Sequence, residues 1–498
     1  MSEKRKSLIL VTVDCLRSDH CGFYGYSPPT TPFLDTLAAE SMVVPTAVVA
    51  GAPTYYSLPA ILASRMPLAL GRDVIGLAPG EVTLARALRD AGYATAAFSA
   101  ANPYISARFG YQQGFEVFED FLDLECAPAS VETPRNREAQ TAPSGISRLN
   151  RSLRGAARAL GLGAHYDELY FQYCLKIASP PAGSIDALRR FPSAEAIVDR
   201  ALAWLKTEAR KPFFLWLHLM DPHSPYYPTA SAYRELTGKE ISAAHARYLN
   251  EFWNRSDLGP TRLAKKKDAV IDLYDAGIRS ADDQMARLVS RLRENDLWEG
   301  CTFALTADHG EEFLDHGGRY HAPLGLYDEI ARVPLMIRVP GIAKKPIAST
   351  PFSHLHLAPT LLDILDIEPP RTFEGRTLLS NLLEGSPWDA PAIAECVYGC
   401  TNPLRAKDRM GERLLSIRSA ENKMVMRIAA GTTEQVYDLD ADPEELRPLA
   451  GGTHKEVRQQ FLRTAMTHLK NNSNAARAEF RLKARLRNLR SQLQSKSL

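Results

Sequence analysis

The sequence lacks the features of a membrane protein, a secreted protein or a nucleic-acid-binding protein. In its 498 residues no apolar run approaches the ~20 residues of a membrane helix. No early stretch resembles a signal peptide, because the apolar run from Ser7 to Val13 is short and leads directly into Asp14. The formal net charge of +2 gives no indication of nucleic-acid binding. We therefore expect no transmembrane segment and no nucleic-acid partner.

Cysteine is also scarce. The seven cysteines are odd in number, scattered along the chain and without zinc-ribbon spacing. Reduced thiols in a cytoplasmic protein are the expectation for such a pattern. The sequence has no internal repeat. A chain of this length predicts one large domain together with a smaller domain or subdomain.

What the sequence does contain is an alternation of buried strands and amphipathic helices. The run from Ser7 to Val13 is apolar on both faces, which is typical of a central strand in a parallel sheet covered by helices. The pattern predicts an α/β fold with a mixed, mostly parallel sheet between helices. Further strands are predicted over 94–99, 212–219, 302–306 and 333–339, and helices over 31–41, 57–65, 82–91, 193–208 and 268–295.

The character of the chain changes twice along its length. Residues 1–345 form the predicted main domain, with a variable insertion over 126–192 where the periodicity weakens. Residues 346–470 predict a smaller C-terminal α+β subdomain with a small antiparallel sheet, followed by a basic helical tail over 471–498. The insertion is interpreted as a cap over the sheet or as an interface. The tail is a candidate segment for oligomerisation or for contact with a membrane surface. The formation of a homo-oligomer through either segment stays an open hypothesis.

One stretch combines a buried strand with a dense set of potential metal ligands. After the strand Thr302 to Thr306 come Asp308, His309, Glu311, Glu312, Asp315, His316 and His321. A carboxylate followed by an imidazole at a strand's end can aim two ligands at one cation. Nearby glycines allow turns that bring the later histidines back to the same point. The stretch predicts a metal site, and a solvated acidic loop is the alternative.

Two other predicted strands end in similar residue types. Asp14 follows the first strand, and Asp221 and His223 follow the strand over 212–219. Ligands gather at the carboxyl ends of strands in open α/β sheets, although Asp14 could instead cap a helix. Thr54 precedes a predicted helix, where free N–H groups and the helix dipole favour an anion. Metal-assisted phosphoryl or sulfuryl transfer needs such an assembly of cation, hydroxyl nucleophile and imidazoles.

The residues of these motifs and their order along the chain resemble the sulfatase branch of the alkaline phosphatase superfamily. The resemblance covers most of the chain except the insertion and the tail. It is carried by the segments Val13 to Tyr26, Thr31 to Asp35, Asp221 to Tyr226, Thr306 to Glu311, Leu326 to Glu329, Val333 to Leu335, Ala358 to Leu362, and Val436 to Leu439 with Asp442-Pro443. It implies the alkaline-phosphatase-like α/β fold and a sulfatase-like catalytic domain over 1–345.

The resemblance also implies roles for individual residues. The metal ligands would be Asp14, Thr54, Asp308 and His309. His223 and His321 would contact the anionic group of the substrate and act in catalysis, His321 standing where many sulfatases have a lysine. The remaining candidates are His316 as a catalytic residue, Arg17 as a substrate-binding residue, and Asp221, His223 and His321 as ligands of a second metal.

Three positions depart from the family's pattern. The cysteine that sulfatases convert to formylglycine is absent, and Thr54 occupies its place, with Leu58 where the motif's arginine would be. Cys15 stands where many sulfatases have a second metal-binding aspartate. Family relatives with a threonine nucleophile act on phosphate esters, which favours phosphorus over sulfur chemistry.

The resulting hypothesis is a metal-dependent hydrolase or transferase of a small anionic ester, a phosphodiester or phosphonate monoester, with Thr54 as nucleophile. A sulfatase that uses threonine is one alternative, and a degenerate, non-catalytic binding protein is another. Mixed carboxylate and imidazole ligands favour Mn²⁺ or Zn²⁺, with Ca²⁺ and Mg²⁺ left open.

Overall fold

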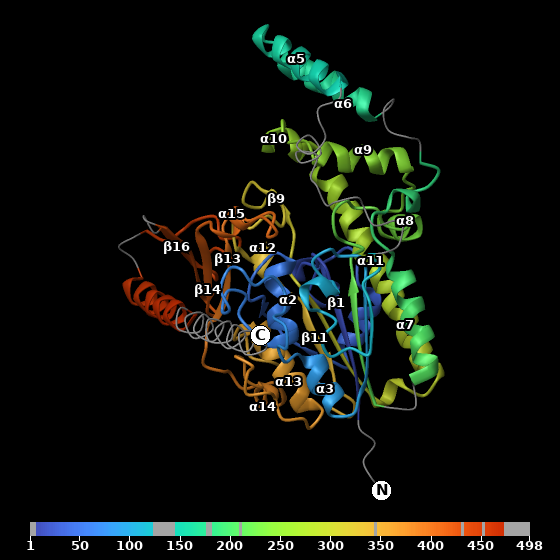
Figure 1. Cartoon of the computed structure of the whole chain (residues 1–498), viewed down its shortest axis with the longest axis vertical. Helices are drawn as coiled ribbons and strands as arrows, with labels where there is room; N and C mark the ends of the chain where they lie inside the picture. The colour runs from blue at the N-terminus through green and yellow to red at the C-terminus, as the bar shows by residue number, and fades with distance from the viewer. Residues whose placement is uncertain are drawn as a thin grey trace, which may run out of the picture.

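The computed structural model describes residues 6–122, 145–175, 182–208, 212–342, 346–429, 433–450 and 454–472. At its centre is a seven-stranded sheet in the order β2-β11-β7-β1-β6-β4-β5 (Figure 1). The strands are β1 (Ser7–Val13), β2 (Met42–Val43), β4 (Ala94–Ser99), β5 (Val117–Glu119), β6 (Phe213–Leu219), β7 (Cys301–Ala307) and β11 (Leu335–Arg338). The sheet is parallel from β7 to β5, whereas β11 runs antiparallel to both of its neighbours. The predicted mixed, mostly parallel sheet is confirmed.

The register of the three central strands decides where the site lies. Val13, the last residue of β1, pairs with Leu219 of β6 on one side and with Ala307 of β7 on the other. All residues of these three strands are buried, which explains why their sequences are mostly apolar and contain no aspartate, glutamate, lysine or arginine. Because the carboxyl ends of the strands are level, the polar residues that follow them meet at one edge of the sheet.

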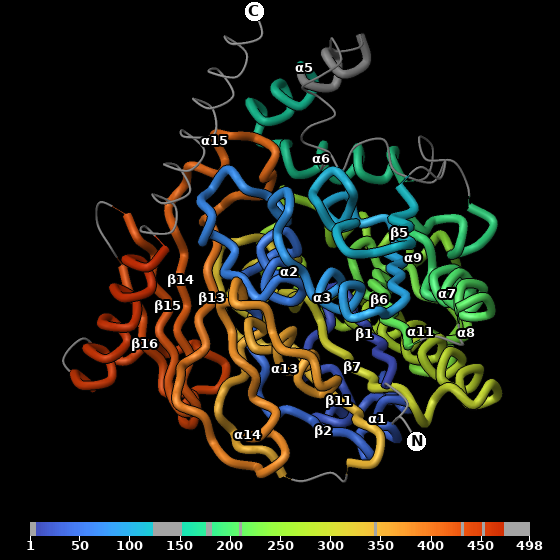
Figure 2. The backbone as a smooth tube through the Cα atoms, turned by 60° about the horizontal axis from the view of Figure 1, so that its bottom comes forward, coloured from blue at the N-terminus to red at the C-terminus, as the bar shows by residue number. Residues whose placement is uncertain are grey.

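Helices cover both faces of the sheet, as Figure 2 shows. On one side lie α2 (Thr54–Ala63), α3 (Leu84–Asp90) and α13 (Leu357–Ile364), and on the other α7 (Ala194–Glu208), α8 (Ala230–Thr237) and the long α11 (Lys267–Glu294). The apolar side of α11 buries residues such as Leu273, Ile278 and Leu288. Further helices are α1 (Pro32–Ala38), α9 (Ala243–Trp253), α10 (Pro260–Leu263), α12 (Asp328–Ala331), α14 (Leu379–Glu384) and α15 (Ala406–Arg409).

Three small sheets complete the fold. The C-terminal part carries an antiparallel sheet of β13 (Ala392–Val397), β14 (Arg413–Arg418), β15 (Asn422–Ile428) and β16 (Thr433–Asp438), against which a helix over 455–472 packs through Phe461 and Ala465. A three-stranded sheet contains β10 (Arg332–Val333), β3 (Ala47–Val48) and β12 (Phe352–Ser353), and a hairpin contains β8 (Glu312–Phe313) and β9 (Arg319–Tyr320). The smaller C-terminal α+β part is thus present, while the predicted domain boundaries stay a prediction.

Two predicted segments are only partly described. The insertion contributes α5 (Gly145–Ala159) and α6 (Gly163–Tyr173), which project beyond the main body in Figure 1. Most of the basic tail, residues 473–498, lies outside the described residues. Among the helices that the structure describes, none has the length and hydropathy needed to span a bilayer.

Candidate active site

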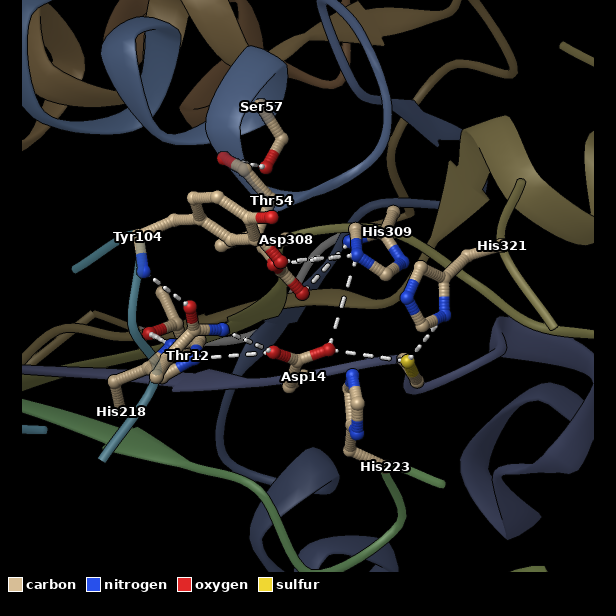
Figure 3. A network of polar contacts seen from close by, with 12 residues as sticks. Thr12, Asp14, Thr54, Ser57, Tyr104, His218, His223, Asp308, His309 and His321 are labelled. Carbon is tan, nitrogen blue, oxygen red and sulfur yellow. Dashed lines mark hydrogen bonds and ion pairs between the residues drawn. The ribbon is translucent and has the colours of Figure 1, made fainter. Parts of the chain in front are cut away.

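The strand ends bring a compact group of potential metal ligands together. Asp14 follows β1 and Asp308 and His309 follow β7, and one ligand atom from each lies within 4.8 Å of the others. All three side chains are fully buried. Thr54 is the first residue of α2, so it lies inside the helix start rather than just before it, and its Oγ1 is 3.2 Å from His309 Nε2. Figure 3 shows the predicted ligand set gathered around one point.

The hydrogen bonds of His309 determine which ring nitrogen faces the group. His309 Nδ1 is 2.8 Å from the Gly310 carbonyl oxygen, which can only accept, so Nδ1 carries the proton. In the neutral ring Nε2 then presents a lone pair toward Thr54 and the carboxylates, 3.8 Å from Asp14 Oδ1 and 3.5 Å from Asp308 Oδ2. A backbone carbonyl that fixes the tautomer in this way is typical of metal-binding histidines.

The two buried carboxylates differ in their ease of ionisation. Burial alone would raise the pKa of Asp14, but the charges of His223 and His309 and a hydrogen bond from His218 lower it well below its ordinary value. Burial and the neighbouring charge of Asp14 raise the pKa of Asp308. Asp308 Oδ2 is also buried without a hydrogen-bond partner in the described part of the chain. Buried carboxyl oxygens of this kind require a compensating charge, and a divalent cation fits the donor set.

A pair of histidines with opposite pKa shifts lies beside the ligand group. Their ring centroids are 5.0 Å apart. Burial lowers the pKa of His223, whose Nδ1 donates to the Ser224 carbonyl oxygen at 2.5 Å. Burial would also lower the pKa of His321, but the charge and the hydrogen bond of Glu311, 2.9 Å from His321 Nδ1, outweigh it and raise the pKa. One imidazole therefore favours the neutral form and the other the charged form.

Comparison with known protein families supports the resemblance seen in the motifs. A family model described as Sulfatase matches residues 6–367, and a model described as N-sulphoglucosamine sulphohydrolase, C-terminal, matches residues 319–472. The chain belongs to the sulfatase family. The match to the first model includes every residue of the ligand group and both histidines beside it.

Curated relatives include both sulfatases and a broader enzyme. The chain is 24% identical over 287 residues to arylsulfatase K of Xenopus laevis, covering 53% of each chain. It is 26% identical over 292 residues to the multifunctional alkaline phosphatase superfamily protein PehA of Trinickia caryophylli, covering 53% of this chain and 56% of the relative. It therefore spans about half the length of these relatives. An arylsulfatase of Clostridium perfringens is 23% identical over 490 residues, with 92% and 93% covered.

Solved structures share the fold. The phosphonate monoester hydrolase of Agrobacterium radiobacter superposes with a TM-score of 0.64 at 18% identity, covering 95% of this chain and 96% of that one. A protein solved with its substrate D-glucosamine-2-N,6-O-disulfate gives 0.66 at 17% identity, covering 95% and 99%. At these identities the likeness establishes the sulfatase-type fold and nothing finer about the chemistry.

Several polar residues of the sulfatase-type site were not predicted from the sequence. Asn102 Nδ2 donates to Asp14 Oδ2 at 3.0 Å, and His218 Nε2 is 3.4 Å from the same oxygen. Glu311 is fully buried, and Tyr226 donates its hydroxyl to it at 2.6 Å. His218 lies within an apolar strand and Asn102 in a turn, so neither belongs to a motif. Glu311 is the exception, because it was among the acidic residues noted after β7.

Cys15 also enters the site. Its Sγ is 3.0 Å from Asp14 Oδ1 and 3.4 Å from His321 Nδ1. It can group with His309 and His321, or with Asp14 and His223, with the ligand atoms within 4.8 Å. Burial and the charge of Glu311 raise the pKa of the thiol well above its ordinary value. The thiol form is thus favoured at this position, where many sulfatases have an aspartate.

Arg17 and His316 are not brought into the ligand group. The guanidinium of Arg17 is held by Asp19, Asp315 and the Glu311 carbonyl oxygen, so that all three of its nitrogens are engaged within the protein. Both ring nitrogens of His316 are likewise occupied, by Glu329 at 2.7 Å and by the Glu445 carbonyl oxygen at 3.1 Å. Their observed contacts position the loop after β7, because neither side chain has an atom left for a substrate.

The predicted second metal set is not assembled either. Asp221 Oδ1 accepts from Arg189 Nη1 at 3.0 Å and its Oδ2 accepts from the Ala194 backbone N–H at 2.9 Å. Both carboxylate oxygens are therefore engaged away from His223 and His321. Among the described residues, the groupings with metal-ligand spacing that contain these histidines use Cys15 in place of Asp221.

Proposed function

We propose that this member of the sulfatase family is a metal-dependent hydrolase or transferase of phosphate esters, either phosphodiesters or phosphonate monoesters, with Thr54 as the nucleophile. One observation carries the proposal. The hydroxyl of Thr54 stands at the start of α2, 3.2 Å from His309 Nε2 and beside the group of Asp14, Asp308 and His309. The motif resemblance assigns this position to the family's formylglycine. A threonine hydroxyl forms a stable ester with phosphorus, and water or a second alcohol can then resolve that ester.

The residues present fit a divalent cation. Asp14, Asp308, His309 Nε2 and Thr54 Oγ1 would hold it, with Mn²⁺ or Zn²⁺ favoured by the mixed donors. When bound, such a cation lowers the pKa of a coordinated hydroxyl and neutralises charge on the transferring oxygens. The protein's own contribution is to exclude water from these donors, since the three carboxylate and imidazole ligands are fully buried.

The histidine pair supplies the proton transfers. Thr54 reacts as the alkoxide: its Oγ1 attacks phosphorus, the bond to the leaving oxygen breaks, and His321, whose charged form is favoured by Glu311, donates a proton to that oxygen. His223, kept neutral by burial, then accepts a proton from the water or alcohol that attacks the phospho-threonine. The phosphorus–Oγ1 bond breaks, Thr54 leaves as the alkoxide that began the cycle, and the proton held by His223 passes to His321, whose ring centroid is 5.0 Å away, so that both imidazoles are restored.

A sulfatase reaction is the second candidate, since arylsulfatases are among the relatives. Retention of the nucleophile, the ligand group and both histidines argues against a degenerate binding protein. Thr54→Ala should abolish turnover of a panel of 4-nitrophenyl phosphodiesters, phosphonates and sulfates, while Thr54→Ser should retain part of it because the hydroxyl persists. Near wild-type activity in Thr54→Ala would refute the nucleophile. Turnover of sulfates alone would refute phosphorus chemistry.

A further inference from the structure

A small cavity that is partly open to solvent adjoins the candidate active site. His223 forms part of its wall, together with Arg189, Arg190, Phe191, Asp221 and Tyr227. Its enclosed space of about 10 Å³ holds roughly one water-sized group. The cavity therefore suits the end of one substituent, such as an oxygen of an acidic group, rather than a whole ligand. Its wall includes a histidine proposed to act on the ester, so a group in the cavity would belong to a molecule bound at that ester site.

The charges in the wall do not balance. Arg189 is paired with Asp221 inside the cavity and lies 3.3 Å from Asp186, which is outside the wall and mostly exposed. Arg190 adds a second positive charge, and no ion pair holds its guanidinium among the residues that the structure describes. One cation in the wall is therefore left without a carboxylate.

The paired arginine also has unused hydrogen-bonding capacity. Nη2 of Arg189 is buried and has no hydrogen-bond partner within the described ranges. A buried guanidinium N–H without an acceptor costs free energy, and an oxygen placed in the cavity would recover it. Phe191 closes one side, packed edge-to-face against His223 with ring centroids 5.3 Å apart. The wall thus joins an apolar surface to two arginines.

We propose that this cavity is a subsite for a second acidic group, a carboxylate, sulfate or phosphate carried on the organic part of the ester substrate. The inference deepens the proposed function and rests on it for the location of the scissile ester. Guanidinium groups bind planar and tetrahedral oxyanions through charge-assisted hydrogen bonds, and Arg190 has no competing carboxylate. The preferred substrates are then esters with at least two anionic groups, one of them distant from the reacting centre.

The test compares esters that differ only in a carboxylate. The parent is 4-nitrophenyl phenylphosphonate, and two derivatives carry a carboxylate on the phenyl group retained by phosphorus or on the leaving aryl group. We expect at least one derivative to be preferred by the wild-type protein in kcat/KM. Arg190→Gln should lower that preference at least about tenfold, since one charge-assisted contact is lost. Arg190→Lys should restore part of it, and Arg371→Gln, at an exposed position outside the cavity, should leave it unchanged.

The outcomes separate the subsite from the reaction itself. Equal preference in the wild type and Arg190→Gln would overturn the subsite while leaving the phosphonate hydrolase intact. If the wild type hydrolyses none of the three esters, calorimetry with phenylphosphonate and 4-carboxyphenylphosphonate decides the subsite alone. Tighter binding of the carboxylated compound that is lost in Arg190→Gln supports the subsite, and equal affinities refute it.

Discussion

Glu311→Gln tests whether His321 is the proton donor. The glutamine keeps the size of the side chain and an oxygen that can accept from the Tyr226 hydroxyl. It removes the negative charge that lies 2.9 Å from His321 Nδ1 and raises the pKa of that imidazole. In the variant, burial still lowers the pKa of His321, and only the charges of Asp14 and Asp308 remain to raise it, so the pKa should fall.

The size of the effect follows from the protonated fraction of His321. In the wild type the raised pKa keeps the imidazole charged to higher pH, and activity is lost as pH rises through that pKa. In Glu311→Gln the same loss begins at lower pH, by about tenfold for each pH unit above the new pKa. The ratio of wild-type to variant kcat/KM should thus grow with pH between the two pKa values and level off above them, below the limit of about 10²–10⁴ that a general acid usually contributes.

The assay is a pH profile of kcat/KM for an ester with a poor leaving group, where protonation matters most. Tyr226→Phe is the matched control, because it removes one hydrogen bond to Glu311 but leaves its charge. The control should keep the wild-type shape of the profile. If Glu311→Gln lowers activity by the same factor at every pH, or leaves the profile unchanged, His321 is not the proton donor.

Two further predictions concern metal binding and stability. Elemental analysis of the purified Asp308→Asn variant should show the loss of stoichiometric metal. Asp221→Asn should keep the metal, because Asp221 lies outside the ligand group. Metal retained in both variants would contradict the ligand set. Lys423→Met should lower the free energy of unfolding, measured in urea, by about 3–5 kcal/mol. The reason is that Lys423 is fully buried between Asp328 at 2.8 Å and Glu445 at 2.9 Å. A change below about 1 kcal/mol would show that these ion pairs add little to stability.

Much of the fold could be predicted because the central strands have an unmistakable sequence. A strand buried on both faces is mostly apolar and carries no charge, and Ser7–Val13 and Cys301–Ala307 fulfil this over their whole length, with only serine, threonine and cysteine among the apolar residues. The antiparallel strands β13 and β14 were not predicted individually. Their sequences, Ala392–Val397 and Arg413–Arg418, mix charged and apolar residues, and their burial depends on distant partners.

The ligand group could be predicted because parallel strands of equal register place their following residues at one edge. That rule makes Asp14, Asp308 and His309 candidates, along with Asp221 and His223, and the resemblance to the sulfatase family singled out the first three. The rule says nothing about which polar side chains are already engaged within the protein. Arg17 and His316 have residue types suited to catalysis, yet three-dimensional contacts occupy every polar atom of their side chains.

The proposed replacement of formylglycine by Thr54 would change what the second half of the reaction requires. A formylglycine hydrate has two hydroxyl groups, so one can expel the group transferred to the other. Threonine has a single Oγ1, and its ester must be resolved by attack of an outside oxygen on phosphorus or sulfur. That attack needs a base, and His223 is the neutral imidazole beside the ligand group, with Nδ1 donating to Ser224 and Nε2 left to accept. Thr54 as nucleophile therefore requires an uncharged His223, and the burial of this imidazole meets that requirement.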